Sequence, residues 1–201
     1  MVSEKHKPLG AKCYGHIGHF PTSRMGPGDH RLPDGQFKIA TQKWRDRHDR
    51  IFVEEKVDGS CCGIAKVNGA ILALGRAGYL AQTSRYEQHQ LFAAWVRQHE
   101  SHFQVILQEG ERFVGEWLAQ AHGTRYEIDD EWDAYVVFDL ICEQERVPFD
   151  ERNDRLDHSY LRRPFLLHRG GPYSVEDALV TLGEHGFHRA LDLVEGAVWR
   201  V

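Results

Sequence analysis

The sequence predicts an α+β domain made mostly of antiparallel sheet with flanking helices. Residues 51–57 and 61–67 are rich in apolar and β-branched side chains, and Asn68-Gly69 followed by residues 70–74 is a strong hairpin signal. Further strand-like and helix-like runs follow without regular βαβ alternation, which favours antiparallel pairing. Because 201 residues can bury one substantial core, we expect a single domain over residues 1–201.

Residues 1–50 predict little regular structure. The segment HFPTSRMGPGDHRLPDGQ, residues 19–36, is dense in Gly, Pro, Asp and Ser, which is typical of an ordered loop. We therefore expect a loop-rich N-terminal extension over residues 1–50. The strands begin at Ile51, and the Asn68-Gly69 pair tolerates the positive φ angles of a type I′ turn.

The middle of the chain combines one helical pattern with two strand patterns. Apolar side chains recur at helical spacing after Ser84, so a helix is expected there. Residues 111–120 and 133–141 are apolar, β-branched and aromatic, and they predict buried strands joined by a polar connection. The residues that set the helical spacing are Leu91, Phe92, Trp95 and Val96.

A second helix and a last strand follow near residue 200. Ser174 is a suitable N-cap for a helix over residues 174–186, because acidic side chains fill the first turn and glycines stand at the end. Residues 195–201 return to strand character.

Composition and charge exclude several classes of protein. No apolar run approaches the roughly 18 residues of a membrane span, and the N-terminus lacks the apolar centre of a signal peptide. We therefore expect a cytoplasmic protein with no membrane partner. The formal net charge of -5 argues against binding to nucleic acid through bulk positive charge, but it leaves room for a local basic groove.

The cysteines follow no disulfide-framework spacing, so reduced thiols are the simpler interpretation. Cys13-x-x-His16-x-x-His19 could supply three ligands of a zinc site, but no second ligand pair is obvious elsewhere. The alternative is a histidine-rich loop.

Lys56 stands at the end of a predicted strand, in Lys56-Val57-Asp58-Gly59. The common phosphate-loop, dinucleotide and serine-hydrolase motifs are absent from the chain. A lysine is a nucleophile only when its amine is unprotonated, so a catalytic site must favour the neutral form. Gly59 would let the backbone approach a ligand closely. On these residues alone, a surface lysine in an Asp-Gly turn remains the alternative.

Other segments extend this motif into a recognisable series. The segments are EKVDG at residues 55–59, Arg76 after the hairpin, FVGEWL with Glu116, YVVFDL with Phe138, and EGAVWR with Glu195. With these segments in this order, the chain resembles the covalent nucleotidyltransferase superfamily, which contains ATP-dependent RNA ligases, DNA ligases and mRNA capping enzymes, and it is most similar to the RNA ligases. Glu116 has independent support, since a carboxylate in an apolar strand is costly without a partner.

The resemblance implies a nucleotidyltransferase (ligase adenylation) domain that acts as an ATP-dependent RNA ligase. Lys56 would be the catalytic nucleophile and would carry AMP as a lysyl adduct. The enzyme would then join RNA 5′-phosphate and 3′-hydroxyl ends through adenylated RNA. Mg²⁺ or Mn²⁺ would be bound by Glu195 and Glu116. The residues implied to bind the nucleotide are Glu55, Asp58, Gly59, Arg76, Glu116, Phe138 and Glu195.

The chain departs from the family at one motif. Family members close with a strand that bears two lysines in a K-x-K pattern, whereas the last lysine here is Lys66. Arg200 could substitute as a phosphate-binding cation. Two alternatives to the ligase follow: a catalytically impaired nucleic-acid-binding or nucleotide-sensing module of the same fold, and a capping-type guanylyltransferase.

A basic tract precedes the first strand. Residues 41–50 carry four cations around Trp44, a composition that could bind a phosphate backbone and stack a base. The cations are Lys43, Arg45, Arg47 and Arg50. Asp46 and Asp49 interleave with these cations, so an internally paired helix face is an equal alternative. The preference for RNA over DNA rests on the resemblance, and the sequence predicts no oligomeric state.

Overall fold

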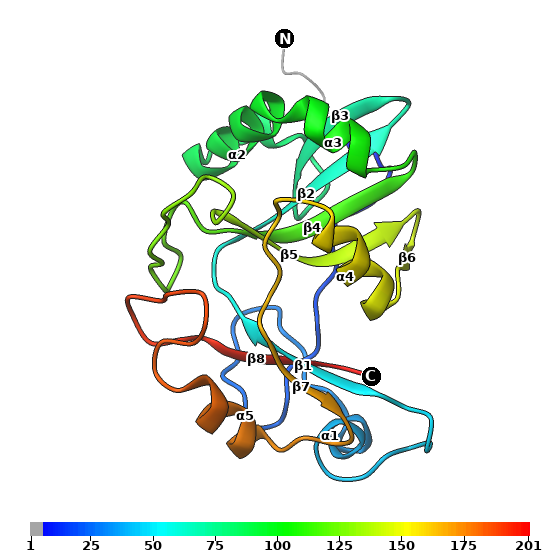
Figure 1. Ribbon diagram of the computed structural model, residues 1–201, viewed down its shortest axis with the longest axis vertical. Coiled ribbons are helices and arrows are strands. Elements are labelled where there is room, and N and C mark those ends of the chain that lie inside the picture. Colours follow the sequence, from blue (N-terminus) through cyan, green and yellow to red (C-terminus); the bar gives the residue numbers. More distant parts are fainter. Residues whose placement is uncertain (1–5) are drawn as a thin grey trace. The chain divides into compact units, whose positions relative to one another are not determined.

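The computed structural model describes residues 6–201, and the chain divides into two compact units. Unit 1 contains the residues up to Gly15 together with Asp58–Arg163. Unit 2 contains His16–Val57 and Pro164–Val201. Each unit has its own sheet (Figure 1) and its own hydrophobic core. A single domain over residues 1–201 stays a prediction.

The helices and strands alternate irregularly along the chain, as the sequence predicts for an α+β protein. Their order is α1 (Asp34–Thr41), β1 (Ile51–Lys56), β2 (Ser60–Val67), β3 (Ala70–Gly75), the 3₁₀ turn η1 (Ala81–Thr83), α2 (Glu87–Gln98), α3 (Glu100–Ile106), β4 (Glu111–Trp117), β5 (Tyr135–Cys142), β6 (Glu145–Arg146), α4 (Phe149–Asp157), β7 (Leu166–Gly170), α5 (Val175–Leu182) and β8 (Gly196–Arg200).

Unit 1 contains an antiparallel sheet in the strand order β3-β2-β4-β5-β6. The predicted hairpin is confirmed, because Val67 pairs with Ala70 across a turn in which Asn68 has φ 51° and Gly69 has φ 76°. Both φ angles are positive, as a type I′ turn requires. The carboxylate of Glu109 accepts the backbone N–H groups of both turn residues and so fixes the turn.

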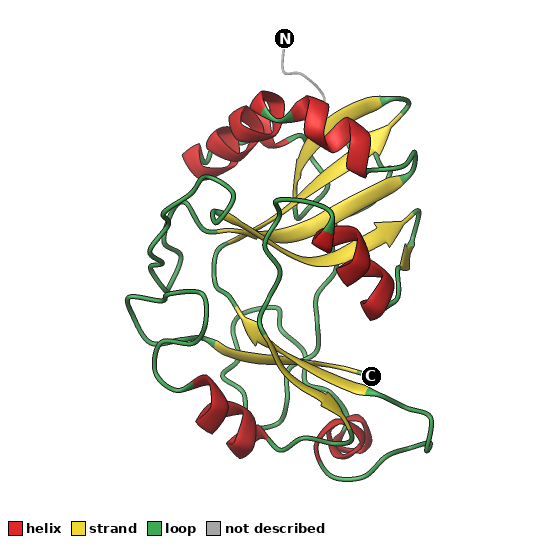
Figure 2. Cartoon of the chain, viewed as in Figure 1, coloured by secondary structure: helices red, strands yellow, loops and turns green. Residues whose placement is uncertain are grey.

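The core of unit 1 lies between one face of this sheet and helices α2 and α3, which Figure 2 shows on that side. Phe92 and Trp95 of α2 pack against Trp117 and Tyr135 of the sheet, with ring centroids 5.2 to 5.7 Å apart. The predicted helix is confirmed, although it begins at Glu87 and exposes Leu91. The opposite face of the sheet is therefore available to polar side chains.

Unit 2 contains an antiparallel sheet in the order β7-β1-β8, with β1 in the centre. Its core includes Ile51 and Val53 of β1 and Ala178 of α5. The prediction that Ser174 caps this helix is confirmed, since its hydroxyl accepts the backbone N–H of Asp177. A central strand is paired on both edges, so the side chains of β1 are held in a fixed register.

The sequence reading missed α1, α4 and β7. Helix α1 lies inside the predicted loop-rich extension and contains Gly35, a weak helix former. Helix α4 is mostly charged, and its buried side chains are Arg152 and Leu156. Its sequence therefore lacks the apolar residues at helical spacing that would predict a helix. Within the described residues 6–201, no helix is long and apolar enough to cross a membrane.

Glu111, at the start of β4, forms a two-pronged ion pair with Arg155 of α4, with N···O distances of 2.7 and 3.1 Å. Burial opposes the charged carboxylate, but hydrogen bonds from Arg155 and from the backbone N–H of Gln108 outweigh it, and the pKa of Glu111 is lowered. The stabilisation is therefore present above the unfolded pKa of about 4.3 and is lost as the pH falls.

We expect Glu111→Gln to lower the free energy of unfolding at pH 7 by about 1–3 kcal/mol, because charged hydrogen bonds are lost. The difference from wild type should shrink as the pH falls below about 4. Urea unfolding across this pH range measures it. Asp157→Asn, which breaks the exposed pair with Arg163, should change stability by less than about 1 kcal/mol. Equal losses in the two variants would contradict the assignment.

Candidate functional site

Lys56 and Glu195 lie together in unit 2. Lys56 is the last residue of β1 and pairs with Gly196, the first residue of β8. Its ammonium forms an ion pair with the carboxylate of Glu195, and both side chains are about one-third exposed. The structure thus brings together the predicted nucleophile and one predicted metal ligand at a solvent-accessible strand end.

The neighbouring Glu55 is buried, with a relative exposure of 2%. Its Oε2 accepts the backbone N–H of Phe187 at 3.0 Å and lies 2.8 Å from Nδ1 of His188. Its Oε1 is buried and has no hydrogen-bond partner among the described residues. An unpaired buried carboxylate oxygen is energetically costly. Oε1 of Glu55 can therefore accept a hydrogen bond from a bound ligand.

Gly186 makes room for this carboxylate. A Cβ atom at position 186 would overlap Glu55 Oε1 and would lie 2.9 Å from Val194 Cγ1, and the residue has φ 57°. Only glycine satisfies both the conformation and the close approach. The loop between α5 and β8 is therefore shaped around Glu55.

Glu54 and Arg200 form a second buried pair on the same strands, with Nε of Arg200 2.7 Å from Oε2 of Glu54. Glu54 has a relative exposure of 1%, and Arg200 is mostly buried. Arg200, the predicted substitute for a phosphate-binding lysine, is therefore paired with the carboxylate of Glu54.

Asp58 and Gly59 belong to unit 1, because the chain passes from unit 2 to unit 1 between Val57 and Asp58. The backbone N–H of Asp58 donates to the hydroxyl of Tyr126 at 2.8 Å, and its carboxylate accepts the N–H of Thr124. At Gly59, a Cβ would lie 2.6 Å from the carbonyl oxygen of Trp117. In this structure Gly59 is thus required by a close approach of β4.

Arg76 and Glu116 lie near each other on the sheet face of unit 1 that is opposite the helices. Glu116 stands opposite Cys61 in the ladder, and Arg76 donates its N–H to the carbonyl of Cys61. Burial raises the pKa of the Cys61 thiol, Glu116 raises it further, and Arg76 opposes the rise. Both charges are therefore close to this thiol. The guanidinium of Arg76 also donates to the carbonyl of Gly15 at 2.8 Å.

Phe138 sits at a β-bulge in β5. Val114 pairs with Asp139 and Gly115 pairs with Val137, so the register between β4 and β5 shifts by one residue at Phe138. A bulge re-aims side chains and is common beside functional sites. The ring of Phe138 packs edge-on against Tyr14, with centroids 5.0 Å apart, and its carbonyl accepts from the buried guanidinium of Arg152.

Tyr14 ties this bulge to the N-terminal segment. Its hydroxyl donates to Oδ2 of the buried Asp139 at 2.6 Å and accepts from Arg146 at 2.9 Å. Asp139 could have been found by the argument that singled out Glu116, since it is also a carboxylate in an apolar strand. Tyr14, Arg152 and His188 carry no comparable signal in the sequence.

The three residues that could have supplied zinc ligands, Cys13, His16 and His19, form no metal-ligand cluster among the described residues. Burial raises the pKa of the Cys13 thiol to about 12, although Arg112 opposes the rise. Nε2 of His19 lies 3.4 Å from Oδ2 of Asp29, so this imidazole contacts a carboxylate. Among the residues that the structure describes, no group of three or more potential ligands comes together.

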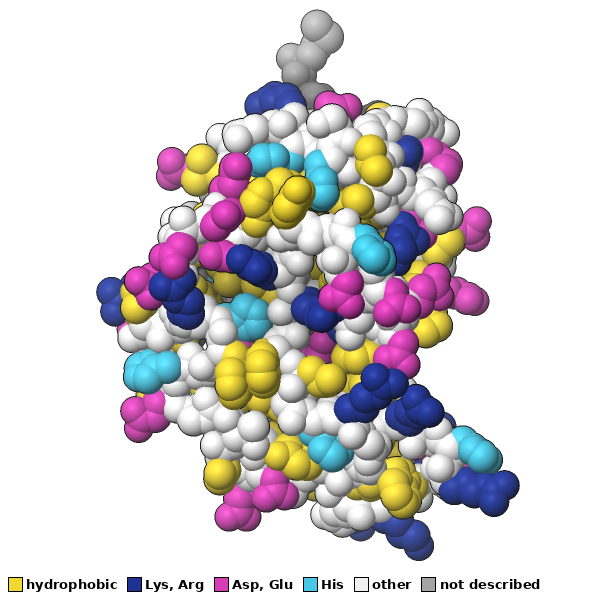
Figure 3. Space-filling model, in the orientation of Figure 1, with side chains coloured by type: hydrophobic (Ala, Val, Ile, Leu, Met, Phe, Trp, Pro, Cys, Tyr) yellow, Lys and Arg dark blue, Asp and Glu magenta, His cyan; other side chains and the backbone are white. Residues whose placement is uncertain are grey.

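The basic tract before β1 is an exposed loop, so the interpretation as an internally paired helix face is wrong. Asp49 pairs with Arg45 at 2.8 Å and accepts the N–H of Asp46, while Asp46 accepts the N–H of His48. Asp49 therefore pairs with one of the four cations, and both acids also accept backbone N–H groups of the loop. Figure 3 shows Lys and Arg side chains gathered over this loop, which follows α1.

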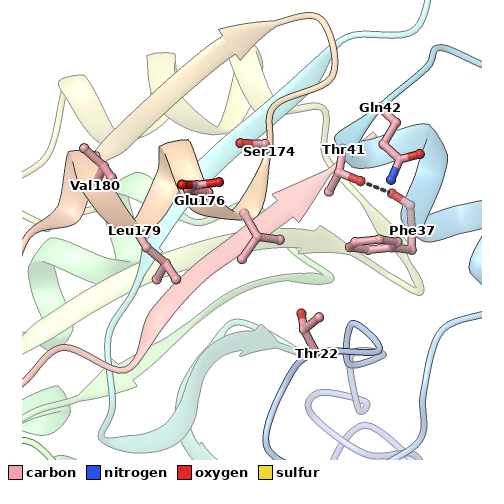
Figure 4. A pocket seen from close by; sticks show the side chains of 9 residues that line it. Thr22, Phe37, Thr41, Gln42, Ser174, Glu176, Leu179 and Val180 are labelled. Atoms are coloured by element: carbon pink, nitrogen blue, oxygen red, sulfur yellow. Dashed lines mark hydrogen bonds between the residues drawn. The ribbon is translucent and has the colours of Figure 1, made fainter.

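Unit 2 also has a groove of about 610 Å³, which other residues line. Figure 4 shows it between α1 and α5, where Thr41 donates to the carbonyl of Phe37 and Leu179 and Val180 present apolar side chains. None of the predicted site residues lines it. The groove has no evident part in the chemistry of Lys56.

The sequence model of the RNA ligase family matches residues 49–201, which is most of the chain. The chain belongs to the RNA ligase family. This membership agrees with the observed pairing of Lys56 with Glu195 at the junction of β1 and β8. No curated protein sequence matches the chain significantly.

Solved structures show the same fold at low identity. A Naegleria gruberi RNA ligase with PPi is 15% identical, with a TM-score of 0.59, over 93% of this chain and 55% of that protein. A lysine-to-alanine variant of that ligase with ATP and Mn matches at 15% identity and a TM-score of 0.59, over 93% and 56%. A lysine-to-methionine variant with AMP and Mn matches at 14% and 0.59, over 94% and 57%. This RNA ligase family chain thus spans little more than half of the solved ligases.

We expect Gly186→Ala to lower the free energy of unfolding by about 2–4 kcal/mol, because a Cβ would both strain the positive φ and collide with Glu55. Gly28→Ala, at φ 86° with open space around the new Cβ, should cost only about 1–2 kcal/mol. Thermal unfolding of both variants measures the difference. If Gly28→Ala were as destabilising as Gly186→Ala, the close packing of Glu55 would not be the cause.

We expect Tyr14→Phe to lower the stability of unit 1 by about 1–3 kcal/mol, because buried Asp139 loses the hydrogen bond from the Tyr14 hydroxyl. Tyr160→Phe is the matched control, since Tyr160 is 69% exposed. Denaturant unfolding followed by tryptophan fluorescence reports on both. A wild-type midpoint in Tyr14→Phe would show that Asp139 does not depend on this hydroxyl.

Proposed function

We propose that the chain carries the nucleotidyltransferase chemistry of an ATP-dependent RNA ligase. The observation that carries this proposal is the ion pair between Lys56 and Glu195, which joins the first and last motifs of the series at one exposed strand end. The family match supports it, since residues 49–201 include every predicted site residue.

The amine of Lys56 would attack the α-phosphorus of ATP. A nitrogen–phosphorus bond forms, the bond to the oxygen of the β-phosphate breaks, and pyrophosphate leaves. The amine must have lost its proton before attack. The adenylyl group then passes from Lys56 to an RNA 5′-phosphate, and an RNA 3′-hydroxyl displaces AMP to form the phosphodiester bond. The protein contributes chiefly alignment and charge stabilisation.

The remaining predicted residues would bind the nucleotide. The bulge at Phe138 presents an aromatic ring suited to stacking on adenine. The vacant acceptor of Glu55 suits a donor such as an exocyclic amine. Arg76, close to Glu116, supplies a cation for phosphate, and Asp58 would orient the site from a backbone fixed by Tyr126.

Glu195 and Glu116 would hold Mg²⁺ or Mn²⁺. Carboxylate oxygens are ligands that these hard cations prefer, and the side chain of Glu195 is 38% exposed and within reach of Lys56. When bound, the cation would offset charge on the phosphates of ATP.

RNA with 5′-phosphate and 3′-hydroxyl ends is the proposed partner. The exposed loop over residues 42–50 supports it, because Lys43, Arg47 and Arg50 flank the half-exposed Trp44. Cations of this kind bind phosphates, and an exposed indole can stack on a base.

We expect the chain to become labelled when incubated with α-labelled ATP and Mg²⁺ or Mn²⁺, and the label to survive denaturation because it is covalent. Lys56→Ala should reduce the label to background, roughly 1,000-fold or more, since no other amine replaces the nucleophile. Denaturing gel electrophoresis measures the labelled fraction.

Lys38→Ala is the control, because Lys38 is an exposed lysine of α1 outside the site. It should label like wild type. Reversible ATP binding without covalent label would instead indicate a nucleic-acid-binding or nucleotide-sensing module. Label from GTP but not from ATP would indicate a capping-type guanylyltransferase.

A further inference from the structure

The loop between α1 and β1, residues 42–50, carries a charge opposite in sign to that of the chain. It contains four cations and two carboxylates, whereas the whole chain has a formal net charge of -5. Lys43, Arg47 and Arg50 are exposed, and none of them forms an ion pair within the part of the chain that the structure describes. A chain of negative net charge repels polyanions, so a basic loop that is not neutralised indicates a local site for an anion.

The two acids of this loop bind its backbone. The carboxylate of Asp49 accepts the N–H of Asp46 at 3.2 Å, and the N–H of Asp49 donates to the carbonyl of Asp46 at 3.1 Å. Asp46 also accepts the N–H of His48 at 2.8 Å. A loop with such internal contacts loses less conformational entropy on binding than a flexible one. The exposed cations are therefore presented on an ordered backbone.

Trp44 packs against a glycine from another segment of unit 2. A Cβ atom at Gly171, which follows β7, would lie 2.7 Å from Cζ2 and 3.2 Å from Cε2 of the indole. The carbonyl of Gly171 accepts from Nε2 of His168 at 2.9 Å, and the N–H of Tyr173 donates to the carbonyl of Ala40 at 3.1 Å. Glycine at position 171 thus leaves room for the ring, and the turn on which the ring lies is itself hydrogen-bonded.

The indole nevertheless remains 49% exposed, although burying it would be favourable. Aromatic side chains beside cations that bind phosphates are the means by which proteins hold single-stranded nucleic acid. Unpaired bases can stack on such a ring, whereas the bases of a continuous duplex are already stacked on one another. The carboxylates of an acidic protein segment would pair with the cations but would not cover the ring. The combination of charge and ring therefore favours an unpaired strand as the occupant.

We propose that residues 42–50 form a binding surface for an unpaired RNA strand, with the indole of Trp44 stacked on one base. The exposed cations Lys43, Arg47 and Arg50 contact phosphates of the same strand. The choice of RNA rests on the proposed function, whereas the stacking and the phosphate contacts do not require the chemistry of Lys56. Because every base has a π face, the surface binds without a strong sequence preference.

The test measures binding of the full chain to a short, fluorophore-labelled RNA in the absence of ATP. The RNA has a 5′-hydroxyl end, so that no adenylyl transfer can accompany binding, and the second ligand is the same strand in a blunt duplex. Fluorescence anisotropy gives each Kd. We expect Trp44→Ala to weaken binding of the single strand by about 5- to 150-fold, the range for one stacked base. Binding of the duplex should stay close to wild type, because the phosphate contacts remain.

A second variant removes charge and keeps the ring. We expect the double variant Lys43→Gln/Arg50→Gln to lower the salt dependence of single-strand binding, with the slope of log Kd against log salt concentration smaller by about 1.4, since each lost phosphate contact removes about 0.7. Trp44→Ala should keep the wild-type slope, because it removes no charge. Titrations across about 50 to 200 mM salt measure both slopes.

Matched variants isolate the position of the ring. Gly171→Ala should weaken binding of the single strand, because the added Cβ would displace the indole. Gly35→Ala, in α1, should leave Kd unchanged, since an added Cβ there meets nothing within 4 Å. Trp44→Phe should retain most of the binding, because a flat aromatic face remains. Thermal unfolding verifies that each variant is folded.

The outcomes separate this inference from the proposed function. Wild-type binding of the single strand by Trp44→Ala would overturn it, and so would an equal loss for single strand and duplex, which would leave a phosphate contact without stacking. Binding of polyglutamate that depends on Trp44 and equals the binding of RNA would assign the loop to an acidic protein instead. Absence of covalent labelling by ATP, with binding of the single strand that depends on Trp44, would remove the ligase function but keep the surface.

Discussion

The burial of Glu55 is the constraint on which unit 2 depends. A buried carboxylate must find donors, and Glu55 takes them from Phe187 and His188, far along the chain. This requirement fixes the loop between α5 and β8, demands glycine at position 186, and aligns β8 so that Glu195 meets Lys56. The arrangement around the lysine is therefore a consequence of satisfying one charge beside it.

Unit 1 uses a different means to present its functional side chains. Its sheet buries one face under α2 and α3, which frees the other face for Glu116, Arg76 and Phe138. The bulge at Phe138 interrupts the ladder, and Arg152 and Tyr14 compensate by binding the carbonyl and packing against the ring. The bulge in the ladder is thus stabilised by a hydrogen bond from helix α4 and by a ring contact from the N-terminal segment.

Local patterns predicted much of the fold, because hairpins, caps and apolar strands depend on residues close in sequence. The Asn68-Gly69 turn and the Ser174 cap are examples. Helix α4 was not predicted, because it is held by the buried side chains of Arg152 and Leu156. Arg152 binds the carbonyl of Phe138 in β5, and Leu156 belongs to the core of unit 1. The site motifs were found from their order along the chain, whereas Tyr14 and His188 act through partners 125 to 133 positions away, which no local pattern contains.

The interleaving of the units has a consequence during synthesis. Strand β1 emerges from the ribosome early, but its partner β8 is made much later, and the Glu54–Arg200 pair spans 146 positions. Closing so long a loop is entropically costly and slow. The whole of residues 58–163 can fold while β1 still waits for its neighbour. A nascent chain would therefore bring Lys56 and Glu195 together only after β8 has been made.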